Sequence, residues 1–180
     1  IASTTTIGSI TGVAINSGSG IAGLTLNAQT GISSITGTAY TGTGIAGTSF
    51  KSLTGNISDI SGSSNSMSGS GDGINGLTIT AIAGSVGNIT GKAAGTGDGL
   101  DTLIVSGQTG IGAILGTSVS GGKGITAGSY TAVSGNITSV TGTTVSGTAI
   151  GGGATFTAIG GTISSITATP TGVGGNAIND

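Results

Sequence analysis

A short motif recurs seven times along this chain and constrains the fold more than any other feature. Each copy has an aliphatic residue, two small or polar residues, a second aliphatic residue, one further residue and then usually glycine. The copies are Ile7-Ile10-Gly12, Ile32-Ile35-Gly37, Ile57-Ile60-Gly62, Val86-Ile89-Gly91, Ile111-Ile114-Gly116, Ile137-Val140-Gly142 and Ile163-Ile166-Ala168. Successive copies start 25, 25, 29, 25, 26 and 26 residues apart, which defines a repeat of about 26 residues and predicts a short insertion within residues 61–70.

Two further apolar clusters follow the motif in each repeat. The first is an aliphatic residue after glycine, at Gly20-Ile21, Gly44-Ile45, Gly73-Ile74, Gly99-Leu100, Gly124-Ile125 and Gly172-Val173, with Ile150 in the sixth repeat. The second contains Leu24/Leu26, Phe50/Leu53, Leu77/Ile79/Ile82, Leu103/Val105, Tyr130/Val133 and Phe156/Ile159. Short β-branched stretches bounded by glycine are typical of strands, and interior glycine disfavours helix by about 1 kcal/mol per residue.

The repeat predicts an all-β fold, a parallel β-solenoid (β-helix) of about seven coils, because one repeat cannot bury its own apolar side. Three strands joined by tight turns predict a triangular coil, stacked in parallel on its neighbours at about 4.8 Å. The second aliphatic residues of successive motifs should then form one buried column, which contains Ile35, Ile60, Ile89, Ile114 and Val140.

The composition excludes most catalytic and metal chemistry. The only charged residues are Lys51, Lys92, Lys123, Asp59, Asp72, Asp98, Asp101 and Asp180. Without His or Cys there is no Cys/His zinc site, no cysteine nucleophile and no Ser-His-Asp triad, so we expect no enzyme and no cofactor. A net charge of −2 offers no basic face for nucleic acid. No apolar run approaches the roughly 18 residues of a membrane span.

The two ends of the predicted solenoid bear on its organisation. The repeat predicts that residues 1–180 form a single β-solenoid repeat domain. We expect this domain to be a segment of a longer chain or a filament subunit. Neither Ile1 nor Asp180 lies in a polar or helical cap of the kind that usually protects open sheet edges. We therefore expect self-association, either head-to-tail or by donation of a strand.

Two acidic positions suggest metal binding. Asp72 and Asp98 lie in matching Gly-Asp-Gly strings, similar to Asp-bearing glycine repeats that bind calcium in β-rolls. The alternative is that both are turn residues, because calcium prefers 6–8 oxygen ligands and carboxylates are scarce here. Asp98 and Asp101 form the only close acidic pair, and two carboxylates can hydrolyse a glycosidic bond. No aromatic platform for a sugar and no Arg lies near them, which argues against glycosidase activity.

Asparagine and threonine patterns also allow two interpretations each. Asn56, Asn88 and Asn136 each begin an Asn-Ile-Ser/Thr glycosylation sequon, and each also suits a tight corner with left-handed backbone. A Thr-x-Thr array follows the motif, similar to the face of ice-binding proteins, although Val13, Lys92 and Leu115 interrupt it. Thr is in any case a good strand residue.

The Gly-Asn-Ile-Ser/Thr strings at 55–58, 87–90 and 135–138 resemble secreted bacterial β-strand-repeat proteins, which include adhesins, autotransporter-like β-helices and surface fibres. Similar phrases occur in phage tail fibres. The resemblance implies an extracellular or cell-surface structural subunit of a self-assembling fibre, sheath or surface layer. The alternative is the stalk or passenger of an adhesin or phage tail fibre that binds a glycan or a host surface.

Overall fold

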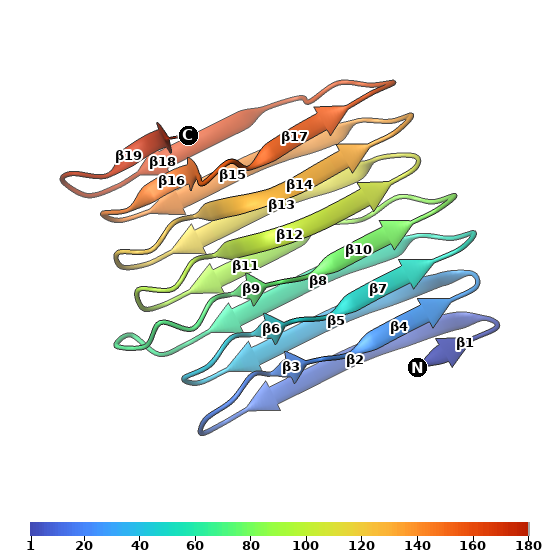
Figure 1. Ribbon diagram of the computed structural model, residues 1–180, viewed down its shortest axis with the longest axis horizontal. Helices are drawn as coiled ribbons and strands as arrows, with labels where there is room; N and C mark the ends of the chain where they lie inside the picture. The colour runs from blue at the N-terminus through green and yellow to red at the C-terminus, as the bar shows by residue number, and fades with distance from the viewer. Residues whose placement is uncertain (180) are drawn as a thin grey trace.

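The computed structural model describes residues 1–179 and consists of two parallel β-sheets wound by one chain (Figure 1). Every strand pair within the described residues is parallel, and no helix occurs among them. The coils stack regularly from the first strands to the last, with one sheet lying behind the other. The predicted all-β, parallel β-solenoid of about seven coils is confirmed.

One sheet has seven strands, which are built from the seven copies of the sequence motif. In chain order they are β2 (Thr6–Ala14), β5 (Gly31–Ala39), β8 (Ile57–Ser64), β11 (Ile89–Ala93), β13 (Ile111–Ser118), β15 (Ile137–Thr144) and β18 (Ile166–Pro170). The other sheet has twelve strands: β1 (Ala2–Ser3), β3 (Ile21–Ala22), β4 (Thr25–Ala28), β6 (Ile45–Ala46), β7 (Ser49–Ser52), β9 (Ile74–Asn75), β10 (Thr78–Ala81), β12 (Leu100–Gly107), β14 (Ile125–Ala132), β16 (Thr148–Gly151), β17 (Thr155–Ala158) and β19 (Asn176–Asn179).

The predicted aliphatic column is present in the seven-stranded sheet. Ile114 pairs with Ile89 on one side and with Val140 on the other, and the column continues through Ile60 to Ile35. All five side chains are buried, at 0–1% exposure. The repeat register read from the sequence is therefore confirmed, because a slip of one residue would turn these side chains to the solvent.

The expected triangular coil is wrong, because the second and third apolar clusters of each repeat lie in the same sheet. They form separate short strands in the early coils, such as β9 and β10, and single continuous strands in β12 and β14. One residue between the clusters has left-handed backbone in each of six coils: Gly23, Gly47, Gly76, Thr102, Ala127 and Gly152, with φ between 47° and 68°. A single left-handed residue makes a local kink, which re-aims the strand without turning it into a third sheet.

Thr102 and Ala127 are the two non-glycine residues of that left-handed position, with φ of 55° and 47°. Left-handed backbone costs an ordinary L-residue about 1–2 kcal/mol. Their strands, β12 and β14, pair in parallel on both sides of the kink. Leu100 pairs with Ile125 before it, and Leu103 pairs with Gly128 after it. The neighbouring pairs therefore hold both residues in a conformation that glycine adopts in the other coils.

The last repeat departs from the sequence alignment. Ile178, not Val173, takes the place after Ile150 in the column, since Ile150 pairs with Ile178. Val173 is fully exposed. Sequence reasoning chose Val173 because it follows glycine, as the aligned residues do in most earlier repeats. The expected insertion is present: Ala39 pairs with Ser64, whereas Ile45 pairs with Ile74, so four extra residues lie in the loop after Ser64.

The core between the sheets is almost wholly aliphatic. Its largest members are Tyr130 and Phe50, and Tyr130 stacks on Phe156 with ring centroids 5.0 Å apart. The Tyr130 hydroxyl is buried and has no hydrogen-bond partner among the described residues. Burial raises the pKa of that phenol strongly, so the ring stays neutral and acts as a large apolar side chain.

The motif glycines lie where the two sheets come closest. A Cβ on Gly116 would lie 2.1 Å from the carbonyl oxygen of Gly124, and one on Gly37 would lie 2.2 Å from that of Gly44. The facing glycines are equally confined, since a Cβ on Gly99 would lie 2.3 Å from the amide nitrogen of Thr117. Backbone therefore packs directly on backbone along this line of glycines.

Candidate functional site

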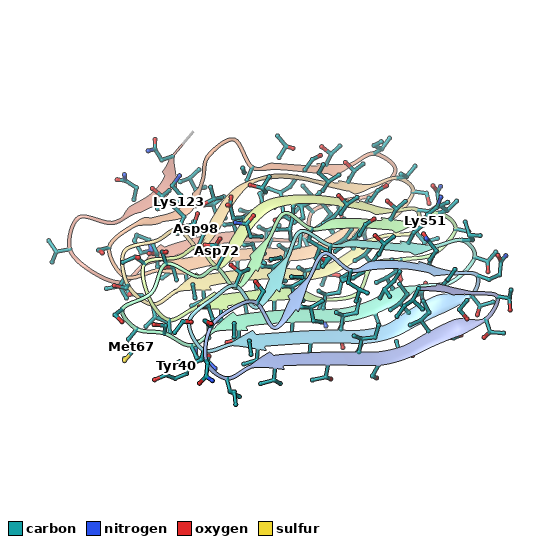
Figure 2. All side chains as sticks on the ribbon, turned by 60° about the horizontal axis from the view of Figure 1, so that its bottom comes forward. Tyr40, Lys51, Met67, Asp72, Asp98 and Lys123 are labelled. Atoms are coloured by element: carbon teal, nitrogen blue, oxygen red, sulfur yellow. The ribbon has the colours of Figure 1, made fainter. Side chains whose placement is uncertain are left out.

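The two calcium candidates lie one above the other at the corner that leads into the twelve-stranded sheet (Figure 2). Asp72 Oδ1 accepts a hydrogen bond from the backbone amide of Asp98 at 2.8 Å. Asp98 Oδ1 accepts one from the amide of Lys123 at 2.6 Å, and Thr43 Oγ1 accepts one from the amide of Asp72 at 3.3 Å. Each side chain thus binds the backbone of the next coil. This ladder supports the interpretation of Asp72 and Asp98 as turn residues.

Asn75 lies between two carboxylates that the sequence analysis did not bring together. Its Nδ2 donates to Asp72 Oδ2 at 2.6 Å and to Asp101 Oδ2 at 3.2 Å. Desolvation raises the pKa of Asp72, and the negative charges of Asp101 and Asp98 raise it further, while the hydrogen bonds from Asn75 and from the Asp98 amide lower it. Sequence reasoning missed Asn75 because its neighbours in the stack do not repeat it: Ala46 precedes it and Asp101 follows it at that position.

The corner has few free oxygens to offer a cation. No group of three or more His, Cys, Asp or Glu residues within the described range 1–179 is placed to hold a metal ion. Three of the four carboxylate oxygens of Asp72 and Asp98 already accept hydrogen bonds. Calcium binding at Asp72 and Asp98 stays a prediction. Within the acidic pair Asp98 and Asp101, Asp101 accepts a hydrogen bond from Asn75, whereas Asp98 accepts one from the amide of Lys123.

We expect Asp72 to make the fold less stable as pH rises. Its pKa in the folded state is raised above the ordinary value of 3.8, so its favourable contribution to stability is complete below pH 3.8. That contribution is lost as pH rises through the raised pKa. Melting temperatures between pH 3 and pH 7 should therefore fall less steeply in Asp72→Asn than in the wild type. Asp59→Asn removes the same charge away from the cluster and is the control; equal slopes in all three proteins would contradict the expectation.

The three sequon asparagines are exposed and also serve coil stacking. Asn56 Oδ1 accepts from the amide of Ser85 at 2.9 Å, and Asn136 Oδ1 accepts from the amide of Thr162 at 2.8 Å, both at the corner before the seven-stranded sheet. Asn88 differs, because it directly precedes β11, donates its amide to Asp59 Oδ1 and accepts from the amide of Ala113. The expected left-handed backbone is wrong for all three, since only Thr102 and Ala127 adopt it among described non-glycine residues.

The Thr-x-Thr array forms two straight files on the outer surface of the seven-stranded sheet. We call this surface the threonine face. The first file is Thr11, Thr36, Ser61, Thr90, Leu115, Thr141 and Thr167, and the second is Val13, Thr38, Ser63, Lys92, Thr117, Thr143 and Thr169. Along these segments the outward residues alternate with residues that face the core, such as Gly37 and Ala39 in β5.

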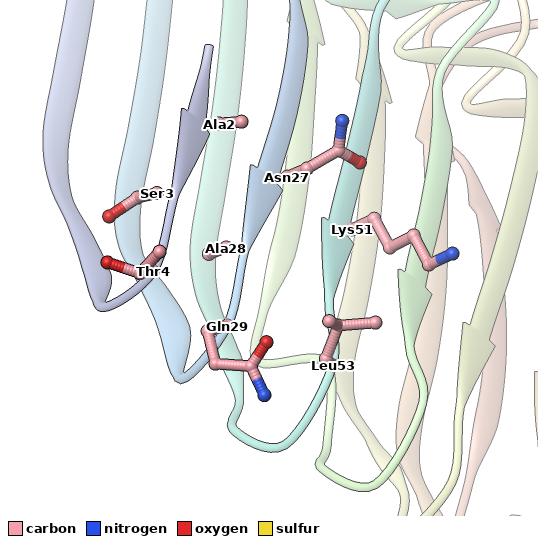
Figure 3. A pocket seen from close by; sticks show the side chains of 8 residues that line it. All are labelled: Ala2, Ser3, Thr4, Asn27, Ala28, Gln29, Lys51 and Leu53. Carbon is pink, nitrogen blue, oxygen red and sulfur yellow. The ribbon is translucent and has the colours of Figure 1, made fainter.

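A groove at the first end of the stack was not anticipated from the sequence (Figure 3). It has a volume of about 320 Å³ and lies beside β1, which covers only part of β4. Its lining residues are Ala2, Ser3, Thr4, Asn27, Ala28, Gln29, Lys51 and Leu53. A second groove of about 250 Å³ lies at the opposite end, between β17 and β19. Both grooves arise where a terminal strand fails to cover its neighbour.

Both ends of the stack are open sheet edges in the described structure. β2 and β18 are the outermost strands of the seven-stranded sheet, and β17 and β19 both lie at the last edge of the other sheet. The core columns reach both edges, but they are exposed mainly at the last coil, since Ile7 and Ile21 of the first coil are buried. Ile166 is 49% exposed although its partner Val140 is buried, and Ile178 is 65% exposed beside the buried Ile150.

Comparison with family models, curated proteins and solved structures finds no match. None of the described residues belongs to a helix that is long and apolar enough to cross a membrane.

Proposed function

We propose that this chain is a structural module of an extracellular fibre, sheath or surface layer, and that it associates end to end by continuing the parallel stack. The observation that carries the proposal is the open sheet edge at each end of the stack, one of which exposes the core columns at Ile166 and Ile178. Unpaired backbone groups beside exposed aliphatic side chains are a ready template for another chain.

The shapes of the two ends support stacking over lateral association. In each coil the same aliphatic positions recur, so the first coil presents Ile7, Ile10 and Ile21 on the columns that end in Ile163, Ile166 and Ile178. A second copy can therefore add its first coil to the last coil of its neighbour without any change of register. Such a heterologous contact repeats indefinitely and forms a filament.

Low surface charge favours this association. The chain has only eight charged side chains and a net charge of −2. Electrostatic repulsion between copies is therefore weak. The extracellular location rests on the resemblance of the Gly-Asn-Ile-Thr strings to secreted repeat proteins. The carboxylate oxygens of Asp72 and Asp98 accept hydrogen bonds from backbone amides of the next coil, which supports a structural role for these acidic residues.

Sedimentation of the isolated chain at micromolar concentration tests the proposal. The wild type should form polymers, also at high salt, because few charges are present to be screened. The double variant Ile166→Lys/Ile178→Lys should sediment as a monomer, since it places two charges on the exposed end of the core. The matched control Ile82→Lys/Ile104→Lys changes residues of similar exposure (46% and 57%) on the side of the stack and should still polymerise. A monomeric wild type would overturn the proposal.

A further inference from the structure

We propose that the threonine face binds ice. This face lies on the side of the stack and not at its ends, so the inference does not depend on end-to-end assembly. Its basis is the regularity of the two files. Each rung of the seven-stranded sheet places one residue of each file at the same level, and the register runs unbroken from Thr11 to Thr167.

The hydroxyl groups of the face are free to bind an external partner. Within the described residues, Ser63 is the one member of the two files that hydrogen-bonds to another side chain, donating to Asn65 Oδ1 at 2.8 Å. The other Thr and Ser members, such as Thr36, Thr117 and Thr143, present a hydroxyl outward, and each Thr adds a methyl group; Val13, Leu115 and Lys92 have no hydroxyl. The groups repeat at about 4.8 Å between strands and about 6.6 Å along each strand, which gives a two-dimensional lattice.

The face is also held rigid from beneath. Between the two files runs the column of motif glycines, among them Gly37, Gly62 and Gly116, whose backbone packs directly on the opposite sheet. Rotation or buckling of these strands would drive backbone into backbone. The hydroxyl lattice is therefore ordered before any partner arrives, which reduces the entropic cost of binding.

The chemistry of the face selects an uncharged, crystalline partner. The files contain one charged residue, Lys92, and the neighbouring outward position adds Asp59. The face therefore has no positive potential that would attract nucleic acid or an acidic polymer. It contains no aromatic residue on which a sugar ring could stack. Ice is uncharged, its surface repeats hydrogen-bonding oxygens on a similar scale, and methyl groups order the water between hydroxyls. Each hydroxyl and methyl group contributes a weak contact to the ice surface, and the many contacts together give firm binding.

Lys92 provides the sharpest test, because it interrupts the second file between Ser63 and Thr117. Lys92→Thr should increase the fraction of protein taken up by slowly growing ice, about twofold or more, and should widen the gap between freezing and melting temperatures. Lys51→Thr is the matched control. It also replaces an exposed lysine between a polar and a Thr neighbour, Asn27 and Thr80, but on the outer face of the other sheet.

A loss variant completes the test. Thr143→Tyr places a bulky ring in the second file, and Thr131→Tyr does the same at a half-buried, outward Thr of the other sheet. We expect Thr143→Tyr to lower uptake into ice at least fivefold and Thr131→Tyr to leave it unchanged. If Thr143→Tyr loses its β circular dichroism signal, Lys92→Thr alone decides. Exclusion of the wild type from ice, or equal responses of Lys92→Thr and Lys51→Thr, would overturn the proposal.

Discussion

Replacing Ile114 by aspartate is expected to abolish the cooperative unfolding of the central coils. Ile114 is fully buried in the middle of the aliphatic column, between Ile89 and Val140. Removing its apolar atoms costs roughly 2–5 kcal/mol, and a carboxylate without a partner in this core adds a desolvation penalty. The sum is comparable with the whole stability of an ordinary domain, about 5–15 kcal/mol.

Thermal unfolding followed by far-ultraviolet circular dichroism measures this effect. Ile104→Asp is the control, because Ile104 lies in the adjacent sheet but points outward and is 57% exposed. We expect the control to melt close to the wild type, and Ile114→Asp to lose most of its β signal at room temperature. An unchanged melting temperature for Ile114→Asp would show that the register of the seven-stranded sheet is wrong.

Replacing Gly116 by alanine is expected to have the second largest effect, although it adds only one methyl group. The new Cβ would lie 2.1 Å from the carbonyl oxygen of Gly124 and 2.7 Å from Ile125 Cγ1. Backbone cannot rotate away as a flexible side chain can, so the two sheets have to separate locally. Overpacking costs typically about 1–3 kcal/mol, and we expect this variant at or above the upper end of that range.

Gly121→Ala is the matched control for this prediction. A Cβ on Gly121 meets only Ser146 Oγ, at 3.8 Å, which is ordinary contact. Chemical denaturation of both variants should therefore separate them by about 3 kcal/mol or more, with Gly121→Ala close to the wild type. Equal stabilities would mean that the sheets are not in direct backbone contact along the motif glycines.

The repeat in the sequence determined the fold class, the number of coils and the register of the seven-stranded sheet. It could do so because parallel stacking places the same position of each repeat at the same level, so that Ile89, Ile114 and Val140 are aligned by spacing alone. The same logic located the four-residue insertion within residues 61–70, since only a loop tolerates extra residues without breaking the column.

Only the tertiary structure decided how each coil closes and what its polar residues do. Each coil has two sheets instead of the expected three sides, because a left-handed residue such as Gly76 only kinks the chain between two strands of one sheet. The sequence did not predict this, since the backbone angles of a single residue do not alter the spacing of the apolar residues. Asp72 and Asp98 bind the backbone of the next coil, a contact between residues about 26 positions apart that composition does not reveal. Val173 followed the sequence pattern, yet Ile178 fills the column, because strand pairing and not the preceding glycine decides which residue lies beside Ile150.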